Sequence, residues 1–123
     1  MNDKKSRRKA YSHGVLAEIF VSFFYRIFGY RLVSSRHRTP FGEIDLIMRR
    51  GKSLVFIEVK ARKKRSNQIS AFSERQQKRV FQAAEYFLYK NFGAEKLHSR
   101  IDYVIVGPEL WRIKIISGAD RFM

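Results

Sequence analysis

Two six-residue segments separated by a short turn constrain the fold of this chain more than any other feature. Residues 42–47 read GEIDLI and residues 55–60 read VFIEVK, with a glycine at position 51 between them. Glycine tolerates φ > 0, as the first central residue of a type II′ hairpin turn requires. The segments are therefore predicted to form a β-hairpin with Gly51 and Lys52 as its loop.

This loop sets the register of the hairpin. Asp45 is then expected opposite Glu58, and Glu43 opposite Lys60. The other face carries only apolar pairs: Ile44 with Val59, Leu46 with Ile57, and Met48 with Val55. A slip of one residue would turn the acids into the apolar face, so the pattern supports this register.

Two like charges opposite each other on a sheet lie about 5 Å apart and repel. A divalent cation would explain the arrangement of Asp45 and Glu58, because Mg²⁺ is typically held by one or two carboxylates, waters and a phosphate. The alternative is a solvated outer face. Ile47 and Phe56 continue the same face, which predicts that it is at least partly covered.

Composition indicates one domain with a polyanionic partner. The chain has 123 residues and no cysteine, which fits a reducing compartment such as the cytoplasm. There are 26 Lys and Arg against 11 Asp and Glu, a formal charge of +15. Such an excess most often indicates nucleic acid, with membrane surfaces and acidic proteins as alternatives.

Basic residues occur in three groups. Residues 1–11 are expected to form a flexible basic arm, ahead of one domain over residues 12–123. A second group follows the hairpin and a third lies on a later helix; each could equally be a solvated surface. The candidate phosphate contacts in these groups are Arg62, Lys63, Lys64, Arg65, Arg75, Lys78 and Arg79.

Hydrophobic spacing predicts the remaining elements. Residues 12–28 form an amphipathic helix with Glu18 as its one acid, read neither as a targeting nor as a spanning segment. Residues 30–33 form a strand, and residues 61–72 a polar loop. A second helix starts at Ser73, with Gln76 reaching back in a capping box. Strands over 101–106 and 111–115 complete one mixed sheet packed by helices.

Several other residues could carry chemistry. Lys60 shares a strand face with Glu58 and could steady an attacking water or a developing phosphate charge. Glu43 could support the site or simply pair with Lys60. Glu18 looks like an exposed helical acid on spacing alone. Asp102 interrupts an apolar strand and would need a partner such as Arg100. The three histidines show no zinc-ligand spacing.

The hairpin motifs closely resemble the YraN family of small bacterial proteins. That family belongs to the PD-(D/E)xK nuclease-like superfamily and is similar to archaeal Holliday-junction resolvases. The resemblance covers nearly the whole chain after residue 12. It includes Gly14 and Glu18, Arg38 before the hairpin, the helix from Ser73 and the segment 100–104. It implies a restriction-endonuclease-like α/β fold with a central mixed sheet flanked by helices.

The resemblance also implies the site. Asp45, Glu58 and Lys60 match the catalytic core, and Glu18 matches the helical glutamate that completes the metal site. Arg38 matches a residue before the hairpin and joins the candidate nucleic-acid contacts. Two departures are the Gln at position 76, where the family often has a basic residue, and the segment 36–38, where it often has Asn-x-Arg.

These observations together predict an endonuclease dependent on Mg²⁺ or Mn²⁺, with no organic cofactor. Structure-selective cleavage, for example of branched DNA, and a homodimer are implied by the resemblance alone. The main alternative is a catalytically silent nucleic-acid-binding protein of the same fold. A second alternative is a basic adaptor for an acidic protein or membrane surface. The opposed carboxylates argue against both, because neither needs them.

Overall fold

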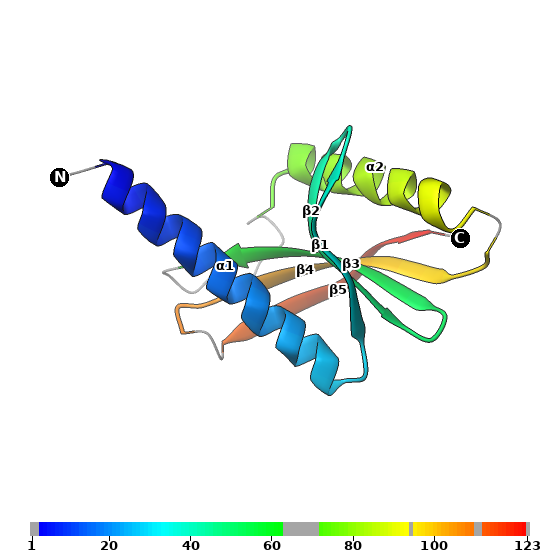
Figure 1. The fold of residues 1–123 in the computed structure, drawn as a ribbon, viewed down its shortest axis with the longest axis horizontal. Coiled ribbons are helices and arrows are strands. Elements are labelled where there is room, and N and C mark those ends of the chain that lie inside the picture. The colour runs from blue at the N-terminus through cyan, green and yellow to red at the C-terminus, as the bar shows by residue number, and fades with distance from the viewer. Residues whose placement is uncertain (1–2, 63–71, 94, 110–111, 123) are drawn as a thin grey trace.

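The computed structural model describes residues 3–62, 72–93, 95–109 and 112–122, with side chains from Gly14 to Ser117 within those ranges. Seven elements follow one another along the chain (Figure 1). They are α1 (Asp3–Ile27), β1 (Arg31–Thr39), β2 (Gly42–Arg50), β3 (Ser53–Ala61), α2 (Glu74–Asn91), β4 (His98–Val106) and β5 (Ile113–Phe122).

The strands form one five-stranded mixed sheet in the order β1-β2-β3-β4-β5. β3 and β4 are parallel and are joined through α2, whereas the other neighbours are antiparallel. A parallel pair needs such a crossover connection, because a tight turn only reverses the chain. The protein is thus a small α/β domain, as expected, and its architecture is consistent with a restriction-endonuclease-like fold.

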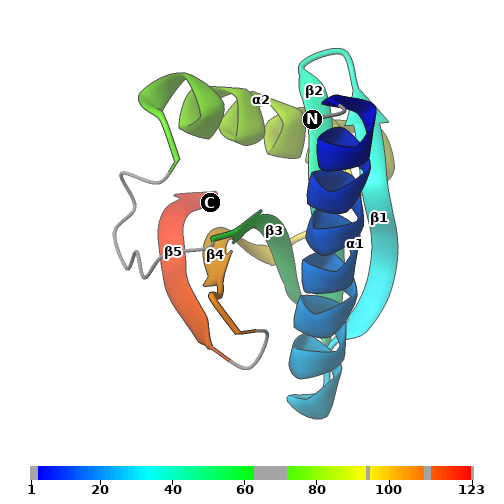
Figure 2. The same ribbon diagram turned by 90° about the vertical axis from the view of Figure 1, so that its left-hand side faces the viewer.

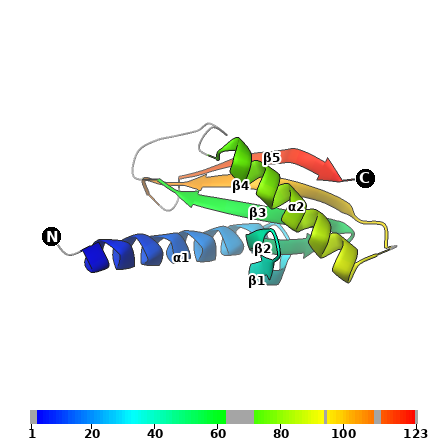
Figure 3. The same ribbon diagram turned by 90° about the horizontal axis from the view of Figure 1, so that it is seen from above.

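The two helices cover opposite faces of the sheet (Figure 3). Successive side chains of a strand point to opposite faces, and β3 shows this clearly. Leu54 and Phe56 join the core under α2, whereas Val55 and Ile57 join the core under α1. All four are fully buried. β3 is therefore the central strand, and its nearly continuous apolar sequence reflects burial on both sides.

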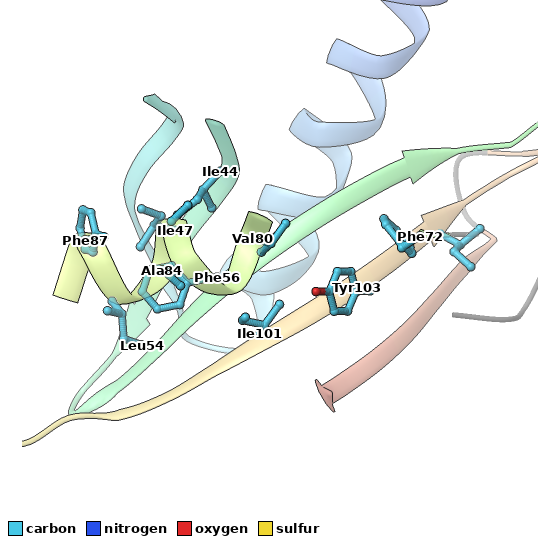
Figure 4. Packing of buried hydrophobic residues seen from close by; sticks show 12 residues of the cluster. Ile44, Ile47, Leu54, Phe56, Phe72, Val80, Ala84, Phe87, Ile101 and Tyr103 are labelled. Atoms are coloured by element: carbon cyan, nitrogen blue, oxygen red, sulfur yellow. The ribbon is translucent and has the colours of Figure 1, made fainter. Parts of the chain in front are cut away.

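Aromatic side chains fill much of the core under α2 (Figure 4). The ring of Phe56 lies 5.8 Å from that of Phe87, and Phe72 lies 4.8 Å from Tyr103, measured between centroids. Ser73 caps α2, as predicted, by accepting a hydrogen bond of 3.1 Å from the backbone N–H of Gln76. This cap and core fix the first turn of α2 over the sheet.

The predicted hairpin register is confirmed from the turn to the middle of the strands. Leu46 pairs with Ile57 and Met48 with Val55, and Gly51 has a φ of 59°. The backbone ladder ends at Leu46 and Ile57. Beyond this point β2 continues with β1 and turns away from β3 (Figure 2). The two strands therefore form a fork that opens toward the N-terminal end of β2.

The fork corrects two expectations about the hairpin. Glu43 is not paired with Lys60, because β2 has left β3 before that position. Glu43 lies opposite Arg38 on β1 instead. Ile44 was predicted on the face of Leu46, but it packs in the core under α2. The sequence pattern predicts the alternating faces of a flat hairpin. It contains no signal that β2 separates from β3.

The first helix also differs from its prediction. It begins at Asp3, not near Ser12, so residues 3–11 are helical where a flexible arm was expected. Lysine, arginine and alanine favour helices, and no proline or glycine interrupts the chain before Gly14. The N-terminal turns of α1 extend beyond the strands (Figure 1). No helix among the described residues is long and apolar enough to cross a membrane.

A buried polar network ties α1 to the far strands. Asp102 accepts hydrogen bonds from the hydroxyl of Tyr25 at 2.7 Å, the Nε of Arg100 at 3.0 Å and the hydroxyl of Ser117 at 3.0 Å. The predicted pairing of Asp102 with Arg100 is therefore confirmed. Burial next to this carboxylate raises the pKa of the Tyr25 phenol, which keeps it a neutral donor.

Candidate active site

Asp45 and Glu58 meet at the point where β2 and β3 separate. The backbone N–H of Asp45 donates to Oε1 of Glu58 at 3.1 Å, and the backbone N–H of Val59 donates to Oδ2 of Asp45 at 2.8 Å. Each carboxylate thus binds a backbone N–H of the opposite strand just where the ladder ends. This exchange satisfies backbone groups that the fork leaves without a ladder partner and holds both side chains in place.

Both carboxyl groups are shielded from water. Glu58 is only 3% exposed, and Asp45 is partly buried. Burial raises the pKa of Asp45 to about 6, and the nearby charge of Glu18 adds to the effect. Burial and the charge of Asp45 raise the pKa of Glu58 to about 8. The fold therefore disfavours two negative charges here unless a cation compensates them.

The first two turns of α2 contribute a cation and an amide to this site. Arg79 lowers the pKa of both Asp45 and Glu58 by its positive charge, opposing their burial. The Arg79 side chain lies over Gly42, where a Cβ atom would collide with it, and Gly42 has a φ of 127°. Gln76 hydrogen-bonds the carboxylate of Glu58 through its side chain. The Ser73 half of the predicted capping box is confirmed, and the Gln76 side chain interacts with Glu58.

Lys60 follows Glu58 on the same face of β3, as predicted. Its Nζ lies 5.8 Å from the ring centroid of Phe72, a cation–π contact that helps to orient the side chain. The carboxylates and these basic groups line one surface hollow of about 400 Å³. Its lining residues are Gly14, Glu43, Asp45, Glu58, Val59, Lys60, Ala61, Gln76 and Arg79.

Glu18 reaches the neighbourhood of this cluster but is held by another residue. Its carboxylate forms a two-bond ion pair with Arg36, with Nε–Oε1 at 3.2 Å and a second bond of 3.3 Å. Among the described residues, no three histidine or acidic side chains are gathered closely enough to hold a metal ion together. The structure thus brings Asp45 and Glu58 together, without the third ligand that the resemblance implied.

The remaining predicted residues lie around this cluster. Glu43 lines the hollow and pairs with Arg38 at 3.5 Å, where the Arg38 side chain is 88% exposed. Arg75 and Lys78 are exposed on α2. Arg62 follows β3, and its backbone N–H binds the carbonyl of Val106 at 2.8 Å. The predicted contacts at positions 63, 64 and 65 (Lys63, Lys64, Arg65) lie outside the described residues.

Sequence reasoning missed two residues of the site. The role of Gln76 depends on how the first turn of α2 docks on β3, which residue spacing does not encode. Arg36 has a φ of 49°, the left-handed region that few residues other than glycine and asparagine adopt. Its pairing with Glu18 joins two elements that are distant in sequence. The polar segment over residues 34–39, which reads SSRHRT, gave no signal for either property.

The carboxylate pair fits a divalent cation by its chemistry. Mg²⁺ prefers oxygen ligands and is often held by only one or two carboxylates, with waters and substrate phosphates completing its shell. Asp45 and Glu58 supply such oxygens from rigid positions, and a cation would relieve the repulsion that raises their pKa values. Asp45 and Glu58 are therefore the residues that would hold the metal ion.

Comparison with known proteins places the chain in one group. The sequence model of the uncharacterised protein family UPF0102 matches residues 17–106. A UPF0102 protein of Mesorhizobium japonicum is 39% identical over 110 residues, 89% of this chain and 88% of its own length. UPF0102 proteins of Rhizobium leguminosarum bv. trifolii and Maricaulis maris are 40% and 41% identical. These alignments cover 87% of this chain and 88% and 84% of the relatives.

Proposed function

The chain belongs to the uncharacterised protein family UPF0102, as the hairpin motifs predicted, and we propose that it is a Mg²⁺- or Mn²⁺-dependent endonuclease that hydrolyses phosphodiester bonds of nucleic acid. One observation carries the proposal. Two mutually repelling carboxylates, the partly buried Asp45 and the buried Glu58, line an open hollow together with Lys60. The pair costs stability without a cation, so a bound metal gives a reason for its presence.

Each residue has a role in this proposal. Asp45 and Glu58 hold the metal ion, which would activate a water and neutralise charge on the phosphate when bound. Lys60 orients the water or stabilises the developing negative charge from the same strand face as Glu58. Arg79 and Gln76 position Glu58, and Glu43 supports the rim of the hollow. Glu18 is a further metal ligand by resemblance to the family.

The positive charge of the protein supports a nucleic-acid substrate. The resemblance to the family favours DNA as that substrate. With +15 formal charges, the chain would bind phosphates with little sequence readout and with strong salt dependence. Arg75 and Lys78 project from the helix that carries Arg79 and would contact the backbone beside the hollow. Preference for branched DNA, and a homodimer that would suit such a substrate, rest on the resemblance alone.

A second candidate function is nucleic-acid binding without turnover. It is supported by the missing third ligand, since Glu18 is paired with Arg36 and, among the described residues, is not gathered with Asp45 and Glu58. In this alternative, binding needs no metal and survives neutralisation of the acids.

A cleavage assay separates the two functions. The protein would be incubated with labelled branched, flapped, single-stranded and duplex DNA and RNA, in Mg²⁺ or Mn²⁺. We expect the wild type to cleave at least one member, and Asp45→Asn and Glu58→Gln to lose at least about 100-fold in rate. Glu85→Gln, an exposed acid on α2, is the matched control and should retain full activity. Tight binding without cleavage, unchanged in Asp45→Asn, would contradict the endonuclease and leave the binding protein.

A further inference from the structure

Arg36 combines two unusual properties at the edge of the carboxylate cluster. It is the one residue other than glycine with positive φ among those the structure describes. A left-handed conformation is unfavourable for a residue with a Cβ atom and persists only when the surroundings enforce it. In Arg36 it accompanies a two-bond ion pair with Glu18, across the gap between β1 and α1.

The position of Arg36 brings this ion pair next to Asp45. Ser35 and His37 pair with Leu46 and Ile44, so Arg36 and Asp45 lie at matching positions of β1 and β2. The charges of Glu18 and Arg36 both act on Asp45, in opposite directions. Glu18 and Asp45 are thus electrostatic neighbours, and the guanidinium of Arg36 takes part in both interactions.

The ion pair holds Glu18 in a groove that is different from the hollow lined by Asp45 and Glu58. Glu18 and Arg36 both line a groove between α1 and β1, together with apolar residues such as Ile19 and Phe23. Asp45 and Glu58 line the separate hollow described above. Glu18 is largely buried, with 16% of its side chain exposed, so its partner decides where the carboxylate points. Its present partner is a cation supplied by the protein.

We propose that Arg36 is a positioning residue. It holds the Glu18 carboxylate in an ion pair and competes with a divalent cation for that carboxylate. This inference rests on the proposed metal site at Asp45 and Glu58. When a cation is held by Asp45 and Glu58, the Glu18 carboxylate would leave Arg36 and serve as a further ligand. Arg36 thereby lowers the metal affinity of the protein.

Substitution of Arg36 tests this competition. Asn is the suitable replacement, because it tolerates positive φ and cannot form the ion pair. Mn²⁺ binding would be measured by calorimetry for the wild type, Arg36→Asn, Glu18→Gln and the double variant. We expect Arg36→Asn to bind Mn²⁺ roughly two- to fivefold more tightly than the wild type, the range that loss of a partly exposed ion pair implies.

The double variant separates release of Glu18 from a general effect of charge. Loss of any nearby positive charge favours a cation, and such an effect would persist without Glu18. If Arg36 acts through Glu18, Arg36→Asn gains nothing in the Glu18→Gln background. An equal gain in both backgrounds would overturn the proposal. So would Mn²⁺ affinity in Arg36→Asn that is equal to or weaker than that of the wild type.

Two controls complete the experiment. Arg49→Asn removes the ion pair that Arg49 on β2 forms with Glu95, at residues that do not line the hollow, and should leave Mn²⁺ affinity unchanged. Arg36→Gly also permits positive φ and replaces Arg36→Asn if that variant does not fold, as judged by circular dichroism. Absence of Mn²⁺ binding in every variant would overturn the proposed metal site and this inference together. Binding by the wild type with no gain in Arg36→Asn would overturn the inference alone.

Discussion

At the scale of residues, the site depends on two side chains that replace a backbone ladder. Asp45 and Glu58 bind backbone N–H groups of opposite strands at the fork. They therefore have a structural role besides the metal-binding role that we propose. Burial raises both pKa values, because the fold shields the carboxyl groups more than it compensates their charges. This arrangement predicts how stability depends on pH in the absence of metal.

The raised pKa values mean that the folded protein binds more protons than the unfolded chain. The window runs from the ordinary values of 3.8 and 4.5 up to about 6 for Asp45 and about 8 for Glu58. The free energy of unfolding should fall as the pH rises through this window. Glu58→Gln, which stays neutral, should exceed the wild type in stability at pH 8 by roughly 4 kcal/mol, with no difference near pH 4.

Urea denaturation in EDTA at several pH values measures this difference. Glu85→Gln removes an exposed acid and should differ from the wild type equally at every pH. A stability difference between Glu58→Gln and the wild type that does not change with pH would contradict the account. The side-chain amide introduced by Glu58→Gln can still accept the N–H of Asp45, so the comparison isolates the charge.

The sequence supports a correct prediction of where some of these residues lie and not of others. Asp45, Glu58 and Lys60 could be placed together because residue type, turn glycine and alternation agree on one register. Arg36 and Gln76 could not, because their roles depend on a rare φ value and on helix docking. Both are set by tertiary packing, which a single sequence does not reveal.

At the scale of elements, the network around Asp102 joins α1, β4 and β5. The buried carboxylate accepts from Tyr25, Arg100 and Ser117, each from a different element or position. Removing the charge of Asp102 would leave the Arg100 guanidinium without its carboxylate partner. Removing the Tyr25 hydroxyl would cost one hydrogen bond and leave the ion pair intact.

Variants of this network should therefore differ in stability. Asp102→Asn should lower the free energy of unfolding by about 3 kcal/mol, and Tyr25→Phe by about 1 kcal/mol. Chemical denaturation gives both values. Mn²⁺ affinity should be unchanged in Tyr25→Phe, because the network lies apart from the carboxylate pair. If Asp102→Asn costs no more than Tyr25→Phe, the ion pair does not stabilise the fold as described.

Element boundaries could be predicted where local chemistry sets them. Ser73 marks the start of α2, and Gly51 marks the hairpin turn, because capping and positive φ are local requirements. The fork could not be predicted, since β2 leaves β3 to follow β1 and only the assembled sheet decides this. The start of α1 at Asp3 was not predicted. The basic residues of this segment indicated a flexible arm, although lysine, arginine and alanine favour helices.

At the scale of the whole molecule, the described part of α1 presents an exposed apolar surface. Leu16, Ile19, Phe23 and Ile27 recur at helical spacing along α1, and Phe28 follows. The exposed fractions of these five residues range from 48% to 81%. Together they present roughly 600 Å² of apolar surface, near the upper limit for a monomer and comparable with one side of a small interface.

This surface fits the proposed homodimer. Phe23→Asp should shift the protein toward the monomer, because a charge in a buried apolar interface is costly. Sedimentation equilibrium at high micromolar concentration measures the change. Tyr89→Asp is the matched control, since Tyr89 is 80% exposed on α2, outside this surface. A wild type that is already monomeric would contradict the homodimer and leave the carboxylate site unaffected.

The central claim is that the fold builds a cation site from Asp45 and Glu58. The most direct test is the unfolding temperature with and without Mg²⁺ at pH 8, for the wild type and Asp45→Asn. A ligand that binds only the folded state raises this temperature. The account predicts a clear rise in the wild type and little or none in Asp45→Asn. No rise in the wild type, or an equal rise in both proteins, would contradict it.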